Sequence, residues 1–239
     1  MITEKQNTFL PGVDEHWFKY LLGTLITVFF IVPLFDDLLT IPFPWSSKIL
    51  YLLVFLMILI GAIRISNRNS KVRPVCILVG FMAMLMNVLF LQWPWIGFMI
   101  IHHLLMVMVL GYFTISLTVY FFNCRSVTHY TIYAALSSYL MIALIWALMY
   151  GTIDMLQPDA FNVSLVPSPG GYLYDQGNAI SFPSFYYSII TITTLGYGDI
   201  IPLSDSARAL SSAEAFTGQM FIAITIARLV GIYSAQKAC

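Results

Sequence analysis

Charged residues are scarce in this chain. Asp, Glu, Lys and Arg make up 9% of its 239 residues, whereas soluble domains carry roughly a quarter. Hydrophobic residues make up 59%, and the mean hydropathy is +0.85. The composition therefore indicates an integral membrane protein. The formal net charge is zero, from 11 basic and 11 acidic residues, so nothing in the charge balance suggests a nucleic-acid partner.

Cysteine is also rare, and its pattern excludes two classes of site. The three cysteines, Cys76, Cys124 and Cys239, are odd in number and widely spaced, which fits neither a disulfide framework nor a metal-binding CxxC pair. We interpret them as small apolar residues. The first 17 residues are polar and mixed in charge, unlike a signal peptide, so we expect them to remain in the mature chain.

The apolar residues form stretches of membrane-spanning length. A hydrocarbon core of about 30 Å needs about 20 mostly apolar residues per helix. Residues 74–124 contain no Asp, Glu, Lys or Arg and are too long for one crossing, so we expect them to fold back at Gln92–Trp95, QWPW, because proline ends helices and tryptophan favours the interface. We expect an all-α membrane protein with six spanning helices, near residues 18–38, 48–63, 74–91, 96–122, 130–150 and 206–233.

The basic residues predict the orientation of these helices. With the N-terminus in the cytoplasm, only Lys48 and Arg208 of the 11 Lys and Arg residues fall outside. Since short cytoplasmic loops carry an excess of Lys and Arg, we expect both termini on the cytoplasmic side of a cell membrane. Seven aspartates then lie on the outer face, where they either attract cations or form a solvated rim: Asp36, Asp37, Asp154, Asp159, Asp175, Asp199 and Asp205.

One uncharged stretch, Gln176–Gly198, is a poor candidate for a seventh span, because a full crossing would place Arg228 and Lys237 outside. Residues 182–193 predict a short helix, which ends before two glycines that permit backbone angles other residues resist. Irregular backbone at membrane depth is tolerated only where it is buried in protein or lines a watery cavity. We therefore expect a re-entrant helix and loop that line a pore.

The loop itself carries a known signature. Thr193–Asp199, TTLGYGD, resembles the selectivity filter of potassium channels, in which backbone carbonyls replace the water around the ion. The resemblance extends over residues 130–239. It implies a homotetramer with four filters around one pore, passing K+ down its gradient without a cofactor. The competing interpretation is a glycine-rich turn that only reverses the chain.

The resemblance also implies the ion ligands. They are the backbone carbonyls of Thr194, Leu195, Gly196 and Tyr197 and the hydroxyl of Thr194, with Gly198 completing the filter. Leu195 stands where valine is commoner, and the substitution is conservative because the backbone makes the contact.

Three further residues are expected to support the filter from behind. Tyr186 and Tyr187 match the aromatic pair that buttresses it, and Asp199 is expected to hydrogen-bond behind it, with Tyr187 as the candidate partner. Ile190 stands where some members of the family carry a carboxylate, so that acid pair is absent here.

The last span contains the only carboxylate well inside a predicted helix, Glu214. Acids within the membrane are functional hypotheses by default. We expect Glu214 to bond to the back of the short helix at Ser188 or Thr191 and to support the filter; a titrating gate is the alternative.

The same span supplies a candidate hinge and a cavity lining. Gly218 falls where related channels bend to open, although a small residue also permits close helix packing. Gln219, Ala223 and Ala227 recur at helical spacing and are expected to line the cavity.

The first four helices are expected to form a peripheral domain, residues 18–129, between an N-terminal segment, residues 1–17, and a pore domain, residues 130–239. The helix at 96–122 contains no Arg or Lys, so voltage sensing by moving arginines is not expected. The basic segment RISNRNSKVR sets topology and is close enough to the membrane to touch anionic lipid.

Other chemical residues have more ordinary interpretations. His102 and His103 are adjacent and face different sides of a helix, so we expect packed or interfacial histidines. The alternative interpretation is that one of them titrates near neutral pH. Asp36 and Asp37 are interpreted as solvated loop acids. Asn162, in NVS, is a glycosylation acceptor only in a eukaryotic secretory pathway.

The sequence thus predicts a potassium-selective channel, and not an enzyme, because no nucleophile, base and orienting group occur together. The partners implied are three further copies of the chain, membrane lipid and K+. The alternatives are a less selective cation channel, and a membrane subunit of an ion transporter or sensor.

Overall fold

The computed structural model describes residues 16–31, 34, 56, 60, 72–93, 95–163, 173 and 182–238. Regular structure within these ranges is helical except for one pair of two-residue strands. In chain order the elements are α1 (Trp17–Ile26), the π-helix η1 (Thr27–Ile31), α4 (Val72–Gln92), α5 (Ile96–Asn123), α6 (His129–Leu156), β1 (Phe161–Asn162), α7 (Phe182–Ile192), β2 (Ile201–Pro202) and α8 (Asp205–Ala238).

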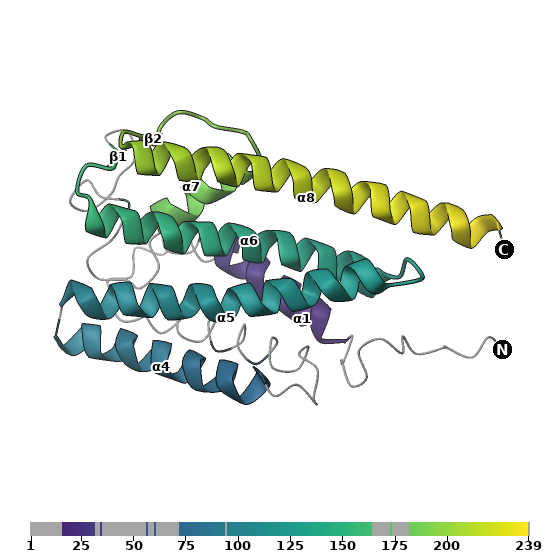
Figure 1. Ribbon diagram of the computed structural model, residues 1–239, viewed down its shortest axis with the longest axis horizontal. Helices are drawn as coiled ribbons and strands as arrows, with labels where there is room; N and C mark the ends of the chain where they lie inside the picture. Colours follow the sequence, from purple (N-terminus) through teal and green to yellow (C-terminus); the bar gives the residue numbers. More distant parts are fainter. Residues whose placement is uncertain are drawn as a thin grey trace.

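Long helices dominate the arrangement, with α4, α5, α6 and α8 running side by side along the longest axis (Figure 1). Within the described residues, three helices are long and apolar enough to cross a membrane, namely Ile96–Asn123, His129–Leu156 and Asp205–Lys237. The mostly helical membrane architecture is therefore confirmed. The expected span at 48–63 lies outside the described residues, apart from Leu56 and Ile60, so the total of six spans stays a prediction.

The break expected at QWPW separates α4 from α5. Helix α4 ends at Gln92, and α5 begins at Ile96 with Trp95 in extended conformation as its N-cap residue. Trp93 and Trp95 are exposed, as expected for side chains at a membrane interface.

The turn from α5 to α6 is short and capped. Residues 124–128 connect the two helices, and the hydroxyl of Thr128 accepts a hydrogen bond from the backbone N–H of Thr131 at 3.3 Å. The hydroxyl of Thr131 accepts one in return from the backbone N–H of Thr128 at 3.3 Å. This reciprocal cap satisfies backbone donors that begin α6 and places α6 antiparallel to α5.

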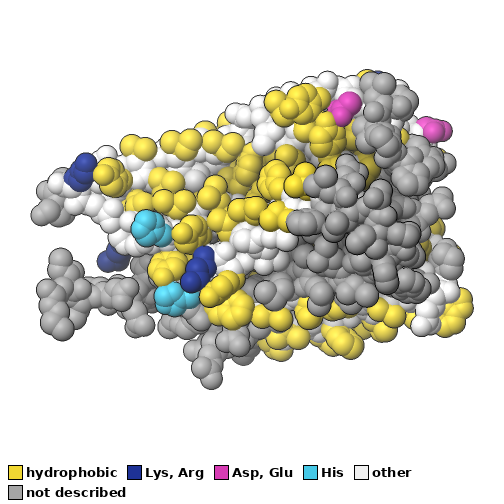
Figure 2. All heavy atoms as spheres, turned by 180° about the vertical axis from the view of Figure 1, so that it is seen from behind, with side chains coloured by type: hydrophobic (Ala, Val, Ile, Leu, Met, Phe, Trp, Pro, Cys, Tyr) yellow, Lys and Arg dark blue, Asp and Glu magenta, His cyan; other side chains and the backbone are white. Residues whose placement is uncertain are grey.

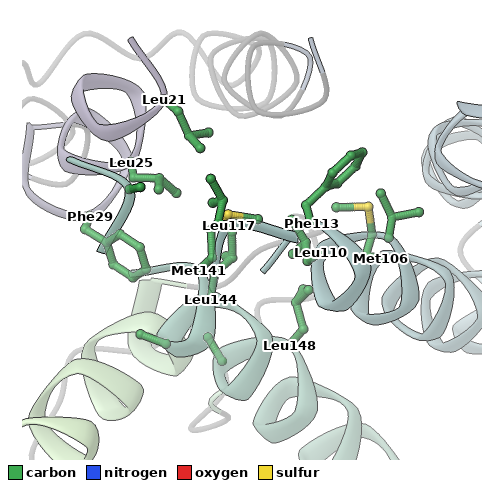
Figure 3. Packing of buried hydrophobic residues seen from close by; sticks show 14 of the residues in the cluster. Leu21, Leu25, Phe29, Met106, Leu110, Phe113, Leu117, Met141, Leu144 and Leu148 are labelled. Carbon is green, nitrogen blue, oxygen red and sulfur yellow. The ribbon is translucent and has the colours of Figure 1, made fainter. Parts of the chain in front are cut away.

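A continuous hydrophobic core joins the helices before residue 129 to those that follow it. Leu21, Leu25 and Phe29 point from α1 and η1 towards side chains of α5 and α6, including Leu117 and Met141 (Figure 3). The core cluster also contains Phe185 of α7, whose ring meets that of Phe29 edge to face at 5.1 Å. The π-helix η1 thus contacts α7, the short helix that precedes Thr193–Asp199, a segment called the filter sequence below for its resemblance.

Charge is distributed unevenly along the molecule. Most of the dark blue Lys and Arg side chains lie at one end and the magenta acids at the other (Figure 2). Asp199 and Asp205 flank β2 at the acidic end, whereas Lys237 lies near the end of α8. This segregation is the pattern from which both termini are predicted to be cytoplasmic.

Candidate functional site

Helix α7 is the short helix expected before the filter sequence, observed at Phe182–Ile192 instead of 182–193. It packs against α6 and α8. The hydroxyl of Tyr139 on α6 donates to the carbonyl of Ile192 at 3.1 Å, and the hydroxyl of Ser188 lies 2.7 Å from the carbonyl oxygen of Ala143. These contacts hold both the middle and the end of α7 against α6.

The backbone after α7 alternates in handedness. Thr194, Gly196 and Gly198 have φ angles of 59°, 51° and 81°, in the left-handed region. The intervening Leu195 and Tyr197 do not have positive φ angles. A positive φ angle is uncommon for a residue other than glycine, so Thr194 is held there by its surroundings. Alternating handedness turns successive peptide carbonyls towards one side, which is the arrangement required of a cation-binding backbone.

Two backbone hydrogen bonds fix this segment to α7. The N–H of Thr194 donates to Thr191 O at 2.9 Å, and the N–H of Gly196 donates to Ile190 O at 3.0 Å. The segment therefore begins at the carboxyl end of α7, where the helix dipole places partial negative charge.

On the far side, Asp199 ties the segment to α7 again. The hydroxyl of Tyr186 donates to Asp199 Oδ2 at 2.6 Å, and the N–H of Ile200 donates to Oδ1 at 3.1 Å. The prediction that Tyr187 is the partner of Asp199 is wrong, because one residue along a helix is a rotation of about 100° and turns Tyr187 away.

Tyr187 instead faces the core behind the segment. Its hydroxyl lies 2.7 Å from Ser211 Oγ on α8. Its ring meets those of Tyr150 and Phe161 edge to face at 4.9 and 5.3 Å. The two adjacent tyrosines thus brace the segment in different ways, one through a hydrogen bond to Asp199 and the other through a buried aromatic cluster.

The strand pair closes the acidic end of the site. Asn162 of β1 pairs with Ile201 of β2 in antiparallel register, and the N–H of Leu203 donates to Ala160 O at 2.8 Å. The chain leaving the filter sequence is therefore fastened to the loop that follows α6.

Glu214 is fully buried between three helices. Its Oε1 lies 2.5 Å from Ser188 Oγ on α7, and its Oε2 accepts from the hydroxyl of Tyr150 on α6 at 2.5 Å. The expected contact with Ser188 is confirmed. Tyr150 was not predicted as a partner, because nothing in the sequence around it marks its hydroxyl as facing α8.

Gly218 and Gln219 bring α8 to the junction of α7 and the filter sequence. A Cβ at Gly218 would overlap the carbonyl oxygen of Ile192 and lie 2.6 Å from Ile192 Cγ1. The Nε2 of Gln219 donates to Thr194 Oγ1 at 3.2 Å. Gln219, Ala223 and Ala227 are all exposed in the single chain, in keeping with the face expected to line a cavity.

The two histidines of α5 face different helices, as predicted for adjacent positions. His102 Nδ1 lies 2.8 Å from Ala83 O on α4, and His103 Nδ1 lies 3.1 Å from Thr152 Oγ1 on α6. Both are buried, which supports the interpretation as packed residues. Asp36 and Asp37 lie outside the described residues.

A family model matches this same part of the chain. Residues 162–235 match the family model described as "Ion channel". Among curated proteins, the chain is 33% identical over 54 residues to "Two pore potassium channel a" of Oryza sativa subsp. japonica, which covers 23% of this chain and 15% of that protein. No solved structure matches the chain.

Two further relatives come from an animal and a bacterium. The "A-type voltage-gated potassium channel KCND3" of Homo sapiens is 37% identical over 51 residues, 21% of this chain and 8% of that protein. The "Voltage-gated potassium channel Kch" of Escherichia coli is 40% identical over 48 residues, 20% of this chain and 12% of that protein. The chain thus matches between 8% and 15% of the length of these relatives.

Proposed function

We propose that this chain, whose residues 162–235 match the ion channel family, forms a potassium-selective channel that conducts K+ passively through a pore shared by four copies. The observation that carries the proposal is the alternating backbone of Thr194–Gly198, fixed to α7 at one end and through Asp199 at the other. A flexible loop presents carbonyls in many directions, whereas hydrogen bonds hold this segment at both ends.

In the proposed pore the ion ligands are the carbonyls of Thr194, Leu195, Gly196 and Tyr197 and the hydroxyl of Thr194. One chain supplies one such row of oxygens, and a ring of them requires several chains around an axis. Leu195 and Tyr197 are 55% and 68% exposed in the single chain. We assign this exposure to surfaces that neighbouring copies cover in a homotetramer.

The inner helix α8 supplies the rest of the pore. Gln219, Ala223 and Ala227 would line its cavity. Large apolar side chains are exposed along the length of α8, where other copies and lipid would cover them: Phe216, Met220, Ile224, Ile226, Val230 and Tyr233.

We further propose that residues 130–239 act as the pore domain, with α7 re-entering the membrane from the outside and both termini in the cytoplasm. Residues 18–129 would form the peripheral domain, following the N-terminal segment 1–17. Since no arginine or lysine occurs in α5, the stimulus that opens the pore would differ from movement of a charged helix.

Recording from purified protein in planar bilayers tests the function. With unequal K+ concentrations on the two sides, balanced by Na+, we expect unitary current steps that reverse near the K+ equilibrium potential. A Gly196→Ala variant is the control, because a Cβ at Gly196 meets no atom within 4 Å yet its φ of 51° strains any other residue. We expect that variant to lose K+ selectivity.

Other outcomes identify the alternatives. Steps that reverse near zero potential would indicate a less selective cation channel. Saturable ion uptake without unitary steps would indicate a transporter or sensor. Silence of the wild type under every pH, voltage and lipid condition would contradict the proposal.

A further inference from the structure

Gln219 is a side chain of α8 that reaches the filter sequence itself. Its Nε2 lies 3.2 Å from the hydroxyl oxygen of Thr194. This reach depends on the preceding residue, because Gly218 has no side chain and lets the α8 backbone lie against the carbonyl of Ile192. The inner helix therefore contacts the last residue of α7 and the first ion ligand at neighbouring positions.

The hydroxyl of Thr194 has its hydrogen committed elsewhere. It donates to the carbonyl of Thr193 at 2.7 Å, and it accepts from Gln219. A hydroxyl oxygen has two lone pairs, so one remains for a further partner after Gln219 has used the other. With both its hydrogen and one lone pair engaged, the hydroxyl is held in one rotational state.

We propose that Gln219 is a positioning residue for the innermost ion site, and that it raises the affinity of this site for a dehydrated cation by fixing the Thr194 hydroxyl. The inference rests on the proposed function and goes beyond a cavity-lining role, in which Gln219 touches only water. Without the amide donor, only the hydrogen bond to Thr193 O holds the hydroxyl, and a cation entering the site must bear a larger cost of ordering it. Preorganised ligands bind more tightly for this reason.

Block by Ba2+ measures the affinity of such a site. The double charge of Ba2+ makes this ion bind oxygen ligands strongly, and its radius is close to that of K+. The experiment uses the full chain in planar bilayers, with Ba2+ added on the side of the cavity. The variants are Gln219→Leu, which removes the amide, and Gln219→Asn, which keeps the amide but shortens its reach. Met220→Leu, a change of similar volume at the next position, is the control.

We expect Gln219→Leu and Gln219→Asn to raise the half-blocking Ba2+ concentration by roughly 2- to 12-fold, the range that one ordinary hydrogen bond accounts for. Met220→Leu should leave it unchanged. Unchanged block in Gln219→Leu, or tighter block, would overturn the inference while leaving the proposed function intact.

A double-substitution cycle separates positioning from a general structural effect. Thr194→Ala removes the hydroxyl, so Gln219→Leu should add nothing further in that background. Additive effects would overturn the inference. Where a variant conducts poorly, thermal unfolding measures the same cycle. The quantity compared is the increase in unfolding temperature that Ba2+ gives each purified variant. A wild type that carries no K+ current would contradict the proposed function instead.

Discussion

The backbone of Gly218 lies against the carbonyl of Ile192, the last residue of α7. A Cβ at Gly218 would overlap that carbonyl oxygen and come within 2.6 Å of the Ile192 side chain. The same oxygen accepts the hydroxyl of Tyr139 at 3.1 Å, so it cannot move away without losing a hydrogen bond. Close packing accordingly has a direct structural basis at Gly218, while its role as a gating hinge stays a prediction.

Gly218→Ala should destabilise the protein by about 1–3 kcal/mol, the usual cost of forcing extra volume into a packed site. The measurement is thermal unfolding of purified protein in detergent. Gly231→Ala is the matched control on the same helix, because a Cβ there meets no atom within 4 Å. Alanine is the better helix former by up to about 1 kcal/mol, so this control should be neutral or stabilising. Equal unfolding temperatures for the two variants would show that the contact with Ile192 is unimportant.

Glu214→Leu should also destabilise the protein, by about 1–3 kcal/mol, because it leaves the buried hydroxyls of Ser188 and Tyr150 without the carboxyl oxygens they contact. Glu214→Gln should cost about 1 kcal/mol or less. Its carbonyl oxygen can accept from Tyr150, and Ser188 Oγ, whose one hydrogen faces two acceptors, can accept from the amide. Chemical denaturation of the reconstituted protein would rank the two variants. A glutamine variant as unstable as the leucine variant would show that the hydrogen-bond pattern is not what Glu214 contributes.

Tyr186→Phe should loosen the filter sequence at its acidic end, because the substitution removes the 2.6 Å hydrogen bond that Tyr186 donates to Asp199. The aromatic ring is kept. The expected cost is about 1.5–3 kcal/mol for a bond to a charged acceptor. In recordings we expect shorter conducting periods and weaker discrimination between K+ and Na+. Tyr187→Phe, the adjacent control, removes the contact with Ser211 and leaves Asp199 paired. Selectivity that falls only in Tyr187→Phe would contradict the assignment of Tyr186.

Arg228→Ala should weaken the contact between α8 and the end of α5. The guanidinium of Arg228 donates through Nη2 to Phe122 O at 2.9 Å and to Cys124 O at 3.4 Å, at the carboxyl end of α5. A cation at this end of a helix contributes about 0.3–1 kcal/mol. We expect hydrogen exchange to accelerate in the last turn of α5, with Lys237→Ala as a control at the end of α8. Unchanged exchange in that turn would show that Arg228 does not cap α5.

Much of the fold follows from local sequence. Apolar stretches of spanning length place α5, α6 and α8, because a helix is the simplest way to satisfy backbone hydrogen bonds in lipid. The turn at QWPW follows from a proline that ends helices and tryptophans that favour the interface. Residue types and spacing also show the resemblance of Thr193–Asp199 to a selectivity filter, since few sequences combine two alternating glycines with the flanking threonine and aspartate.

The sequence by itself therefore determined the membrane environment, most of the helices within the described residues and the place of Thr193–Asp199 between α7 and α8. Only the tertiary structure decided several of the side-chain pairings. It selected Tyr186 over its neighbour as the partner of Asp199, brought Tyr150 to Glu214 across 64 positions, and placed Gln219 on Thr194. The physical reason is that composition and periodicity define a helix and its apolar surface, whereas the rotation and separation of packed helices depend on how all their side chains fit together.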